Sequence, residues 1–312
     1  MITFKLNELY RFLDISKQAV SKSRKRQQLF DQELRELVHQ VDLIREEHPG
    51  CGVEKLYYTL RPKFMGRDKF CELFMHLGYR VRRIKNYRRT TIPVHLNYPN
   101  LIEGMVVNRP YQVIQSDITY FDIGQKFYFM VFIIDVYTRE IVGFNVADNM
   151  RAEENVKALK MTLSLLASVN KRMIHHSDRG GQYGSRIYTE VLEQSGIAIS
   201  MGLKAQDNAY AERVNGTIKN EYLKYWEITN INKLKKMTKK AVEHYNHKRK
   251  HEAFNKKLSP VEFKKTLLDL DTQERPKVII YAEGNYQVKE ASSHLDFDPK
   301  KEPQAHNCPI VI

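Results

Sequence analysis

The chain has 312 residues, a length that predicts about two domains, and its 42% hydrophobic residues exclude a disordered or low-complexity protein. Lysine and arginine total 51 against 37 aspartate and glutamate residues, a net charge of +14, so we expect a polyanionic partner, most commonly nucleic acid. Its 3 cysteines form no CxxC pair, and no apolar run is long enough to span a bilayer, which excludes a disulfide framework and predicts a cytoplasmic protein without a membrane partner.

Residues 1–98 are predicted to form an α-helical DNA-binding region. Ser16 can cap a helix with a basic outward face, and a second helix is expected to end at Pro49-Gly50, followed by shorter helices at Val53–Leu60 and Arg67–Leu77. Residues 1–100 carry 20 Lys and Arg against 11 Asp and Glu, a net of +9, which favours a helix-turn-helix module over a bundle with a solvated charged face. The candidate DNA-binding residues of this region are Lys22, Arg24, Lys25, Arg26, Arg82, Arg83, Arg88 and Arg89.

Beyond a proline-containing linker at residues 99–108, the hydrophobic period changes. Residues 109–272 begin with three strand-like runs, YQVIQSDITYFDI, KFYFMVFIIDVYT and EIVGFNVAD. A helix, a strand at RMIHHSD, a helix, a short strand at IAISMG and two longer helices, from about Asp207 to Trp226 and from Ile231 to about His247, follow. This order predicts an α/β fold, a mixed sheet flanked by helices. Residues 273–312 are predicted to hold one strand and a polar tail.

Three carboxylates in the α/β region are candidate catalytic residues. Phosphodiester cleavage needs an activated nucleophile and stabilised oxygens, which two divalent ions held by carboxylates supply. Asp117 lies in the middle of a predicted buried strand, Asp178 ends a strand before two glycines, and Glu212 lies near the start of a helix. Each has an alternative: a buried hydrogen-bonded aspartate, a turn residue and a solvated glutamate, respectively. Their sequence context distinguishes them from the other acids nearby.

Four segments resemble the second-reading-frame (OrfB) transposases of the insertion sequence 3 family: SDITYF, HHSDRGGQYGS, DNAYAERVNGTIKNE and YNHKRKHEAFNKKLSPVEF. Two earlier segments, LYRFLDISKQAVSKSRKR and IREEHPGCGVEKLYYTL, are similar to the family's opening segment and its helix-turn-helix block. The matches run in the same order and cover roughly residues 8–265.

The resemblance implies an RNase H-like fold shared with the catalytic core of retroviral integrases, with Asp117, Asp178 and Glu212 as the catalytic, metal-binding acids. It implies binding of terminal inverted repeats, cleavage at the element's ends and attack of a 3′-hydroxyl on another phosphodiester. Mg²⁺ is the implied metal, with two ions per site expected and Mn²⁺ able to substitute. The implied partners are double-stranded DNA, further copies of the chain in a dimer or larger oligomer on DNA, and an upstream-frame helix-turn-helix protein; the implied location is the bacterial nucleoid.

The chain departs from the family in the spacing between the second and third acids. Between Asp178 and Glu212 lie 33 residues, two fewer than the family's usual spacing, so the local geometry there is open. Arg213 stands where the family mostly has a small polar residue, which makes it a candidate DNA contact. The chain also lacks the sustained heptads of the upstream frame with which many members are fused.

Six further residues are functional candidates, and three of them also have a structural interpretation. Asn208 can orient Glu212 or a bound water, or cap a helix; His176 can face the site, or be buried by strand alternation. Lys219 can contact phosphate or be solvated. Arg213, Lys248 and Arg249 suit the DNA backbone, whose contacts fix position and salt dependence.

Two other functions compete with a transposase. One is an end-binding regulatory protein without catalytic activity, which the basic segments fit equally well but which gains nothing from three carboxylates facing a phosphate backbone. The other is an RNase H-like nuclease or junction resolvase, which would cleave without joining.

Overall fold

The computed structural model describes residues 6–81, 98–166, 172–202, 205–280 and 309–311, the last three by their backbone alone. The chain divides into two compact units, residues 1–81 and 82–312. No helix within these ranges is both long and apolar enough to cross a bilayer. The domain boundary predicted at residue 98 adjoins residues 82–97, which lie outside the described ranges, and it stays a prediction.

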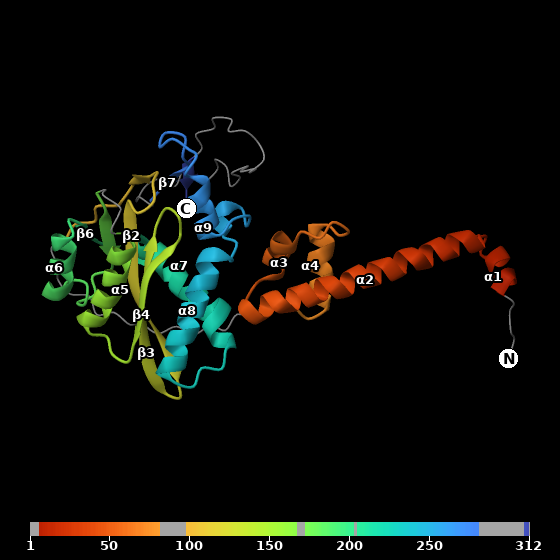
Figure 1. Ribbon diagram of the computed structural model, residues 1–312, viewed down its shortest axis with the longest axis horizontal. Coiled ribbons are helices and arrows are strands. Elements are labelled where there is room, and N and C mark those ends of the chain that lie inside the picture. Colours follow the sequence, from red (N-terminus) through yellow and green to blue (C-terminus); the bar gives the residue numbers. More distant parts are fainter. Residues whose placement is uncertain (1–5, 82–97, 167–171, 203–204, 281–308, 312) are drawn as a thin grey trace. The chain divides into compact units, whose positions relative to one another are not determined.

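The described part of the amino-terminal unit is helical. Ser16 caps its longest helix, since the Ser16 hydroxyl accepts a hydrogen bond from the Ala19 amide at 3.1 Å. That helix is continuous over 31 residues, so the prediction of two successive helices before Pro49 was wrong: no glycine or proline interrupts it. The helices are α1 (Leu6–Phe12), α2 (Lys17–Glu47), α3 (Val53–Leu60) and α4 (Arg67–His76) (Figure 1).

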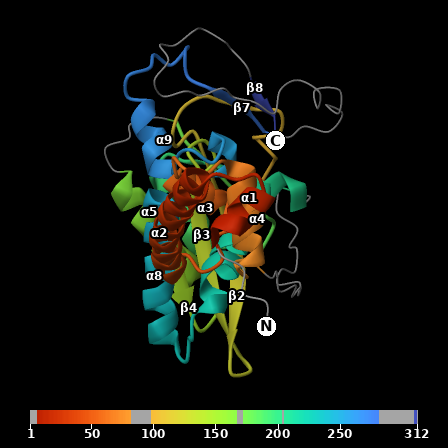
Figure 2. The same ribbon diagram turned by 90° about the vertical axis from the view of Figure 1, so that its right-hand side faces the viewer.

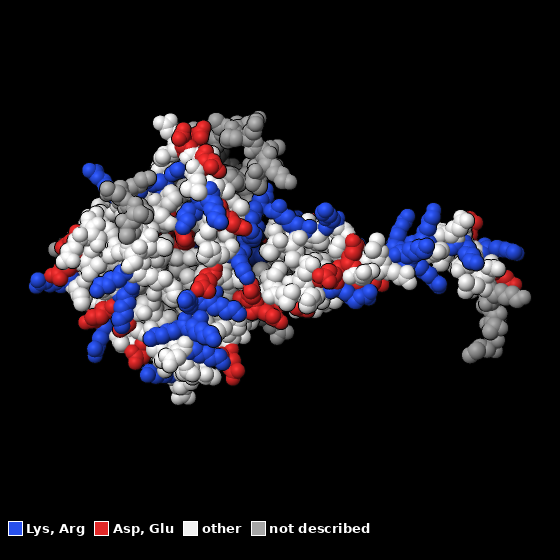
Figure 3. Space-filling model, viewed as in Figure 1, with Lys and Arg blue, Asp and Glu red and all other residues white. Residues whose placement is uncertain are grey.

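Only the second half of α2 contributes to the core of this unit. There, Leu37 and Val41 pack with residues of α3 and α4, including the stacked rings of Phe70 and Phe74. Residues 6–29 contain no buried side chain, and lysines and arginines cover the part of α2 nearest α1 (Figure 3). The first half of α2 is therefore a solvated helix with a basic surface.

A five-stranded mixed sheet organises the carboxy-terminal unit. Its order is β4-β3-β2-β5-β6, antiparallel where β3 meets its two neighbours and parallel from β2 through β6. The hairpin of β2 and β3 runs past the rest of the sheet (Figures 1 and 2). The strands are β2 (Val113–Ile123), β3 (Lys126–Asp135), β4 (Ile141–Ala147), β5 (Ile174–Ser177) and β6 (Ala198–Met201).

One strand of a second, smaller sheet lies in the segment where a linker was predicted. β1 (Val106–Val107) pairs antiparallel with β7 (Lys277–Ile279), which pairs with β8 (Pro309–Val311). Ile102 and Val107 are fully buried in a cluster that also contains Val278. Residues 99–108 therefore belong to the core of this unit, and the linker prediction was wrong because proline content alone cannot reveal burial.

Helices cover both faces of the large sheet. α5 (Ala152–Leu165) and α6 (Arg186–Gln194) pack on one face, and α7 (Ala209–Thr217) and α8 (Ile231–His247) on the other (Figure 1). The single helix expected from Asp207 to Trp226 is instead interrupted. A 3₁₀ turn (Ala205–Asn208) precedes α7, and a π turn (Ile218–Tyr222) and a 3₁₀ turn (Leu223–Tyr225) follow it. Near the smaller sheet lie a 3₁₀ turn (Glu252–Phe254) and α9 (Pro260–Thr266).

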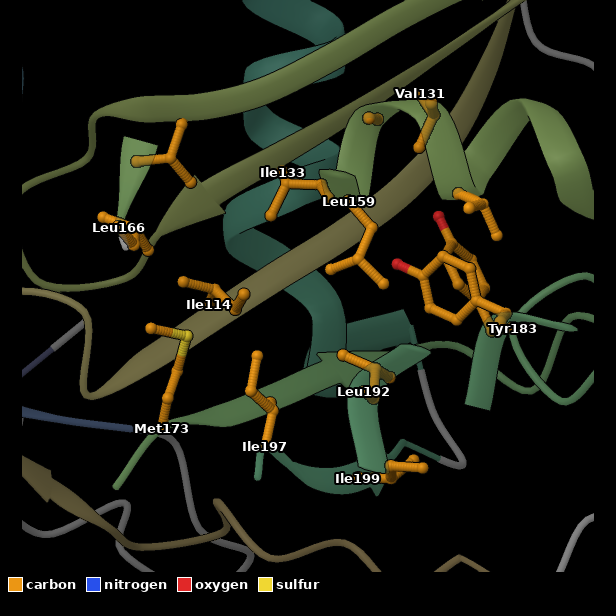
Figure 4. Packing of buried hydrophobic residues seen from close by; sticks show 14 of the residues in the cluster. Ile114, Val131, Ile133, Leu159, Leu166, Met173, Tyr183, Leu192, Ile197 and Ile199 are labelled. Carbon is orange, nitrogen blue, oxygen red and sulfur yellow. The ribbon is translucent and has the colours of Figure 1, made fainter. Parts of the chain in front are cut away.

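The apolar side chains between the sheet and α5 and α6 are closely packed. Ile114, Val131 and Ile133 of the central strands meet Leu159 and Leu192 of the two helices (Figure 4). Strand β4 approaches α5 most closely at Gly143, where an added Cβ would lie 2.1 Å from Thr162 Oγ1. The fold class predicted from the sequence, an RNase H-like mixed sheet flanked by helices and preceded by a helical region, is confirmed.

Candidate active site

Asp117 lies in the middle of β2 and points toward α7. It pairs across the sheet with Phe132, whose side chain belongs to the cluster formed with α7 and α8. Residues directly opposite each other on neighbouring strands share a face of the sheet. Asn215 of α7 donates a hydrogen bond from its Nδ2 to Asp117 Oδ2 at 2.7 Å. The mid-strand carboxylate is thus half-buried and held by an amide.

Asp178 is brought beside Asp117 by the parallel pairing of β2 and β5. Ser116 pairs with Ser177, so the next residue of each strand is one of the two aspartates. The alternation of side chains along one strand cannot bring the two aspartates together, because they lie on different strands. The parallel register of β2 and β5 does so. The Gly180 amide donates to Asp178 Oδ1 at 3.0 Å, which fixes the carboxylate at the start of the loop that follows.

Glu212 reaches the same region from α7. It lies in the first turn of this helix, which packs on β2 and β3, and its side chain is exposed. The part of the Glu212 carboxyl that is shielded from water, followed by the charge of Asp178, raises its pKa. The three predicted acids therefore come from a strand, a strand end and a helix start, and they lie near enough for their charges to interact.

The three carboxylates interact electrostatically. Burial first, and then the like charges of Asp178 and Glu212, raise the pKa of Asp117 to about 8. Repulsion of this kind opposes ionisation of all three acids together unless a cation lies between them. Within the described ranges, no three His, Cys, Asp or Glu side chains are already close enough to share one ion.

Two asparagine amides add oxygen atoms to the region of the three acids. Asn208 does not cap α7 with its side chain; instead its Nδ2 donates to the backbone oxygen of Ser116 at 2.9 Å. The Oδ1 atoms of Asn208 and Asn215 are buried and have no hydrogen-bond partner among the described residues. Carboxylate and amide oxygens are hard donors, so this set fits Mg²⁺ or Mn²⁺ better than a soft metal.

His176 is a buried residue of β5, two residues before Asp178. Its Nδ1 lies 2.8 Å from Ser200 Oγ, and burial lowers its pKa to about 4, so the ring is neutral at physiological pH. Its neighbour His175 contacts the Tyr188 hydroxyl through Nε2 at 2.9 Å on the other side of the strand. Both rings are therefore buried, on opposite sides of the strand.

The candidate DNA-contact residues fall into three groups. Lys22, Arg24, Lys25 and Arg26 are exposed on the first half of α2, whereas Arg82, Arg83, Arg88 and Arg89 lie outside the described residues. Near the acids, Arg213 is exposed, and Lys219 places its ammonium 5.2 Å from the centre of the Tyr120 ring. Burial, and then the charge of Lys224, lower the pKa of Lys219, and the opposite charge of Asp117 offsets only part of this shift. Lys219 therefore lies near enough to Asp117 for their charges to interact.

Arg249 is not available for DNA. Its Nε and Nη2 donate to the two carboxylate oxygens of Glu221, each at 2.8 Å, and its side chain is 8% exposed. The prediction of a phosphate contact at Arg249 was wrong, because the residue forms a buried bidentate ion pair between the end of α8 and the π turn. Its neighbour Lys248 is exposed.

Sequence reasoning missed four residues that hold the site together: Gln115, Ser116, Tyr183 and Asn215. The Tyr183 hydroxyl lies 2.9 Å from Ser116 Oγ and ties the loop after Asp178 to the strand of Asp117. The spacing in the sequence could have indicated two of them. Gln115 is two residues from Asp117 and so shares its face of the strand, and Asn215 is about one turn from Glu212 on the same side of the helix. Nothing in the sequence pointed to the tyrosine contact.

A mixed sheet of this order, with carboxylates gathered where the parallel pairing of β2 and β5 ends, defines the integrase-type class of protein cores. Two family models, both described as an integrase core domain, match residues 107–206 and 195–258. A solved structure of the HTLV-2 integrase catalytic core domain in complex with magnesium is 20% identical, covers 49% of this chain and 91% of that chain, and has a TM-score of 0.38.

Curated relatives identify the family. The insertion element IS600 uncharacterized 31 kDa protein of Shigella sonnei is 34% identical over 209 residues, 64% of this chain and 75% of that protein. The transposase for insertion sequence element IS629 of Shigella sonnei is 35% identical over 46% of this chain and 49% of its own length. A putative transposase for IS986/IS6110 of Mycobacterium tuberculosis is 29% identical over 74% and 86%. The chain belongs to the family of insertion-sequence transposases with an integrase core domain.

Proposed function

We propose that the protein is a DNA transposase that binds the terminal inverted repeats of an insertion sequence and catalyses strand cleavage and strand transfer. The observation that carries this proposal is the convergence of Asp117, Asp178 and Glu212 from separate elements, with the pKa of Asp117 raised to about 8 by burial and by the other two. A group of mutually repelling carboxylates is costly to folding, and such a cost is typical of functional sites.

The three acids would hold divalent metal, Mg²⁺ with Mn²⁺ as a substitute, and two ions per site are expected for phosphodiester chemistry. The bound metal would make a nucleophile competent near neutral pH and stabilise charge on the attacking and leaving oxygens. The orphaned amide oxygens of Asn208 and Asn215 support this assignment, since they add neutral oxygen donors beside the carboxylates.

The chain's own residues would position the DNA. Asn215 holds the Asp117 carboxylate in one orientation through its 2.7 Å hydrogen bond. Lys219, whose ammonium interacts with Asp117, is suited to a phosphate oxygen next to the scissile bond. Arg213 and Lys248 are exposed on the same unit and would contact the backbone farther away. A 3′-hydroxyl of the cleaved strand would then attack a phosphodiester of the target, forming a new P–O ester bond as the existing P–O bond to the target's own 3′-oxygen breaks and that oxygen leaves.

The basic first half of α2 would bind the element ends. Its four exposed cations, Lys22, Arg24, Lys25 and Arg26, lie within about one and a half helical turns, and all but Arg24 share one face of the helix, which suits a phosphate backbone. Joining two ends to a target requires at least two active sites, so we propose a dimer or larger oligomer on DNA. An upstream-frame helix-turn-helix protein is a further proposed partner.

The test is a cleavage and joining assay on end-labelled duplexes that carry the element's own terminus. Wild type is compared with Asp117→Asn and Glu212→Gln, in Mg²⁺, in Mn²⁺ and in chelator. Asp122→Asn is the matched control, because Asp122 lies on the same strand but is exposed. We expect metal-dependent nicking and joined products from wild type and Asp122→Asn, and none from the two site variants. End-specific nicking by Asp117→Asn or Glu212→Gln would refute the catalytic assignment.

A further inference from the structure

Gln115 connects the strand of one acid to the helix of another. It lies two residues before Asp117, on the same face of β2, and is completely buried. Its Nε2 donates to the backbone oxygen of Asp207 at 3.0 Å. Its Oε1 accepts hydrogen bonds from the backbone amides of Tyr210 and Ala211, at 3.2 and 3.4 Å. One side chain thus holds three backbone groups at the start of α7.

Two of the groups that Gln115 holds, the backbone amides of Tyr210 and Ala211, cannot be satisfied within the helix itself. The first backbone amides of a helix have no partner within it and are usually capped by the residue that precedes it. At α7 that residue is Asn208, whose side chain makes no capping hydrogen bond. Gln115 therefore caps α7 from the sheet. Because the capping side chain belongs to β2, the cap also fixes the position of the helix start relative to that strand.

The position of Glu212 follows directly from this cap. Glu212 comes one residue after Ala211, whose amide Gln115 accepts. α7 is 9 residues long and runs into a π turn, so its own length does little to fix its rotation on the sheet. Asn208 and Asn215 also cross to β2, but each does so with a single hydrogen bond. A small rotation of α7 would move the Glu212 carboxylate away from Asp117.

We propose that Gln115 is a positioning residue that sets the separation of Glu212 from Asp117, and thereby the affinity of the site for divalent metal. This inference rests on the proposed function, since it assigns to Gln115 a role in the metal site of that function. Residues that orient metal ligands contribute 10- to 100-fold to metal affinity in other proteins. We expect loss of the Gln115 amide to act in the same range.

A matched control exists elsewhere in the same unit. Asn246 of α8 is a buried amide that likewise joins a helix to a strand: its Oδ1 accepts from the Ile141 amide and its Nδ2 donates to the Ile141 oxygen, both at 2.9 Å. α8 carries none of the three acids. Gln115→Met and Asn246→Leu both remove a buried amide while keeping side-chain volume, so both should lower the melting temperature.

The measurement is Mn²⁺ binding to the full-length protein without DNA, followed by the electron paramagnetic resonance signal of free Mn²⁺. We expect the Kd for Mn²⁺ to rise at least 10-fold in Gln115→Met and to change less than about 2-fold in Asn246→Leu. Gln115→Asn, which keeps an amide but is one methylene too short, should behave like Gln115→Met and guards against a variant that fails to fold. Binding of element-end DNA should be the same in all folded variants.

Two outcomes separate failure of this inference from failure of the proposed function. If wild type binds Mn²⁺ and Asp117→Asn does not, but both Gln115 variants bind it as wild type does, the positioning role is refuted and the metal site stands. If wild type itself binds no Mn²⁺ and cleaves no DNA, both are refuted. An equal loss of Mn²⁺ affinity in Asn246→Leu would also overturn the inference, since general destabilisation would then explain the effect.

Discussion

The substitution Asp117→Asn is expected to stabilise the folded protein in the absence of metal while abolishing activity. Asp117 has a folded pKa of about 8 against an ordinary value of 3.8. Each unit of difference corresponds to about 1.4 kcal/mol. At pH 7 the Asp117 side chain is ionised in the unfolded protein and mostly neutral in the folded one. The free energy of unfolding therefore falls by about 1.4 kcal/mol for each pH unit above the ordinary pKa, which amounts to a penalty of roughly 4 kcal/mol at pH 7.

At pH 7 the Asp117→Asn variant should regain about half or more of the folding free energy that this penalty removes. Its amide is uncharged at every pH, and its oxygen can still accept the hydrogen bond that Asn215 donates to Asp117. The remainder is not recovered because the amide also loses water on burial. A gain of about 2 kcal/mol or more from a single polar substitution is large, since most substitutions destabilise.

The pH dependence provides the diagnostic signature. A raised carboxyl pKa means that the folded state binds the proton more tightly than the unfolded state, so the penalty is absent below about pH 4, grows as the pH rises, and is complete above about pH 8. The stability difference between Asp117→Asn and wild type should therefore increase from pH 4 to pH 8. Any group that titrates in the same way in the variant and in wild type contributes equally to both unfolding free energies, so it does not affect their difference.

The assay is urea denaturation in chelator at several pH values, followed by the fluorescence of Trp226. Trp226 is the only tryptophan of the chain and packs against the α7 and α8 cluster, so it reports unfolding of the unit that holds the site. Asp122→Asn, on the exposed part of the same strand, should match wild type at every pH. The reasoning is refuted if Asp117→Asn is no more stable than wild type at pH 8, or if its advantage does not change between pH 5 and pH 8.

Three further predictions concern packing and charge. Gly143→Ala should destabilise the protein by roughly 3 kcal/mol in denaturant titrations, because the new Cβ would lie 2.1 Å from Thr162 Oγ1 and the strand must move away from α5. Arg249→Met should cost roughly 3 kcal/mol, because it leaves the partly buried Glu221 carboxylate without its cation, yet it should not change the salt dependence of DNA binding. Lys248→Gln should reduce the slope of log Kd against log salt by about 0.9, because Lys248 is exposed and is proposed to contact a phosphate; equal slopes for Lys248→Gln and wild type would exclude that contact.

Periodicity, turn residues and composition determined most of the secondary structure. The alternating runs around Asp117 and the continuous apolar run of β3 predicted the central strands, because apolar side chains of a buried sheet recur at fixed spacing. The three candidate acids were chosen from the same local context together with the family resemblance. Helix ends were also well predicted, as at α8, where the observed bounds Ile231–His247 agree with the sequence expectation.

Only the tertiary structure decided which distant residues meet. The parallel register of β2 and β5 sets Asp178 beside Asp117, and the contacts of Gln115 with Asp207, Tyr210 and Ala211 fix the helix of Glu212. Such contacts depend on strand order and helix rotation, which leave no periodic trace in a single sequence.

The same limit explains the predictions that failed. Arg249 follows a basic residue in an apparently exposed run, yet it turns inward because Glu221, 28 residues away in the chain, offers a buried bidentate partner. Residues 99–108 look like a linker until β7 pairs with them. The sequence by itself determined the elements and the chemistry of the candidate acids. Folding alone decided their neighbours, because burial and hydrogen bonding between distant segments are properties of the three-dimensional arrangement.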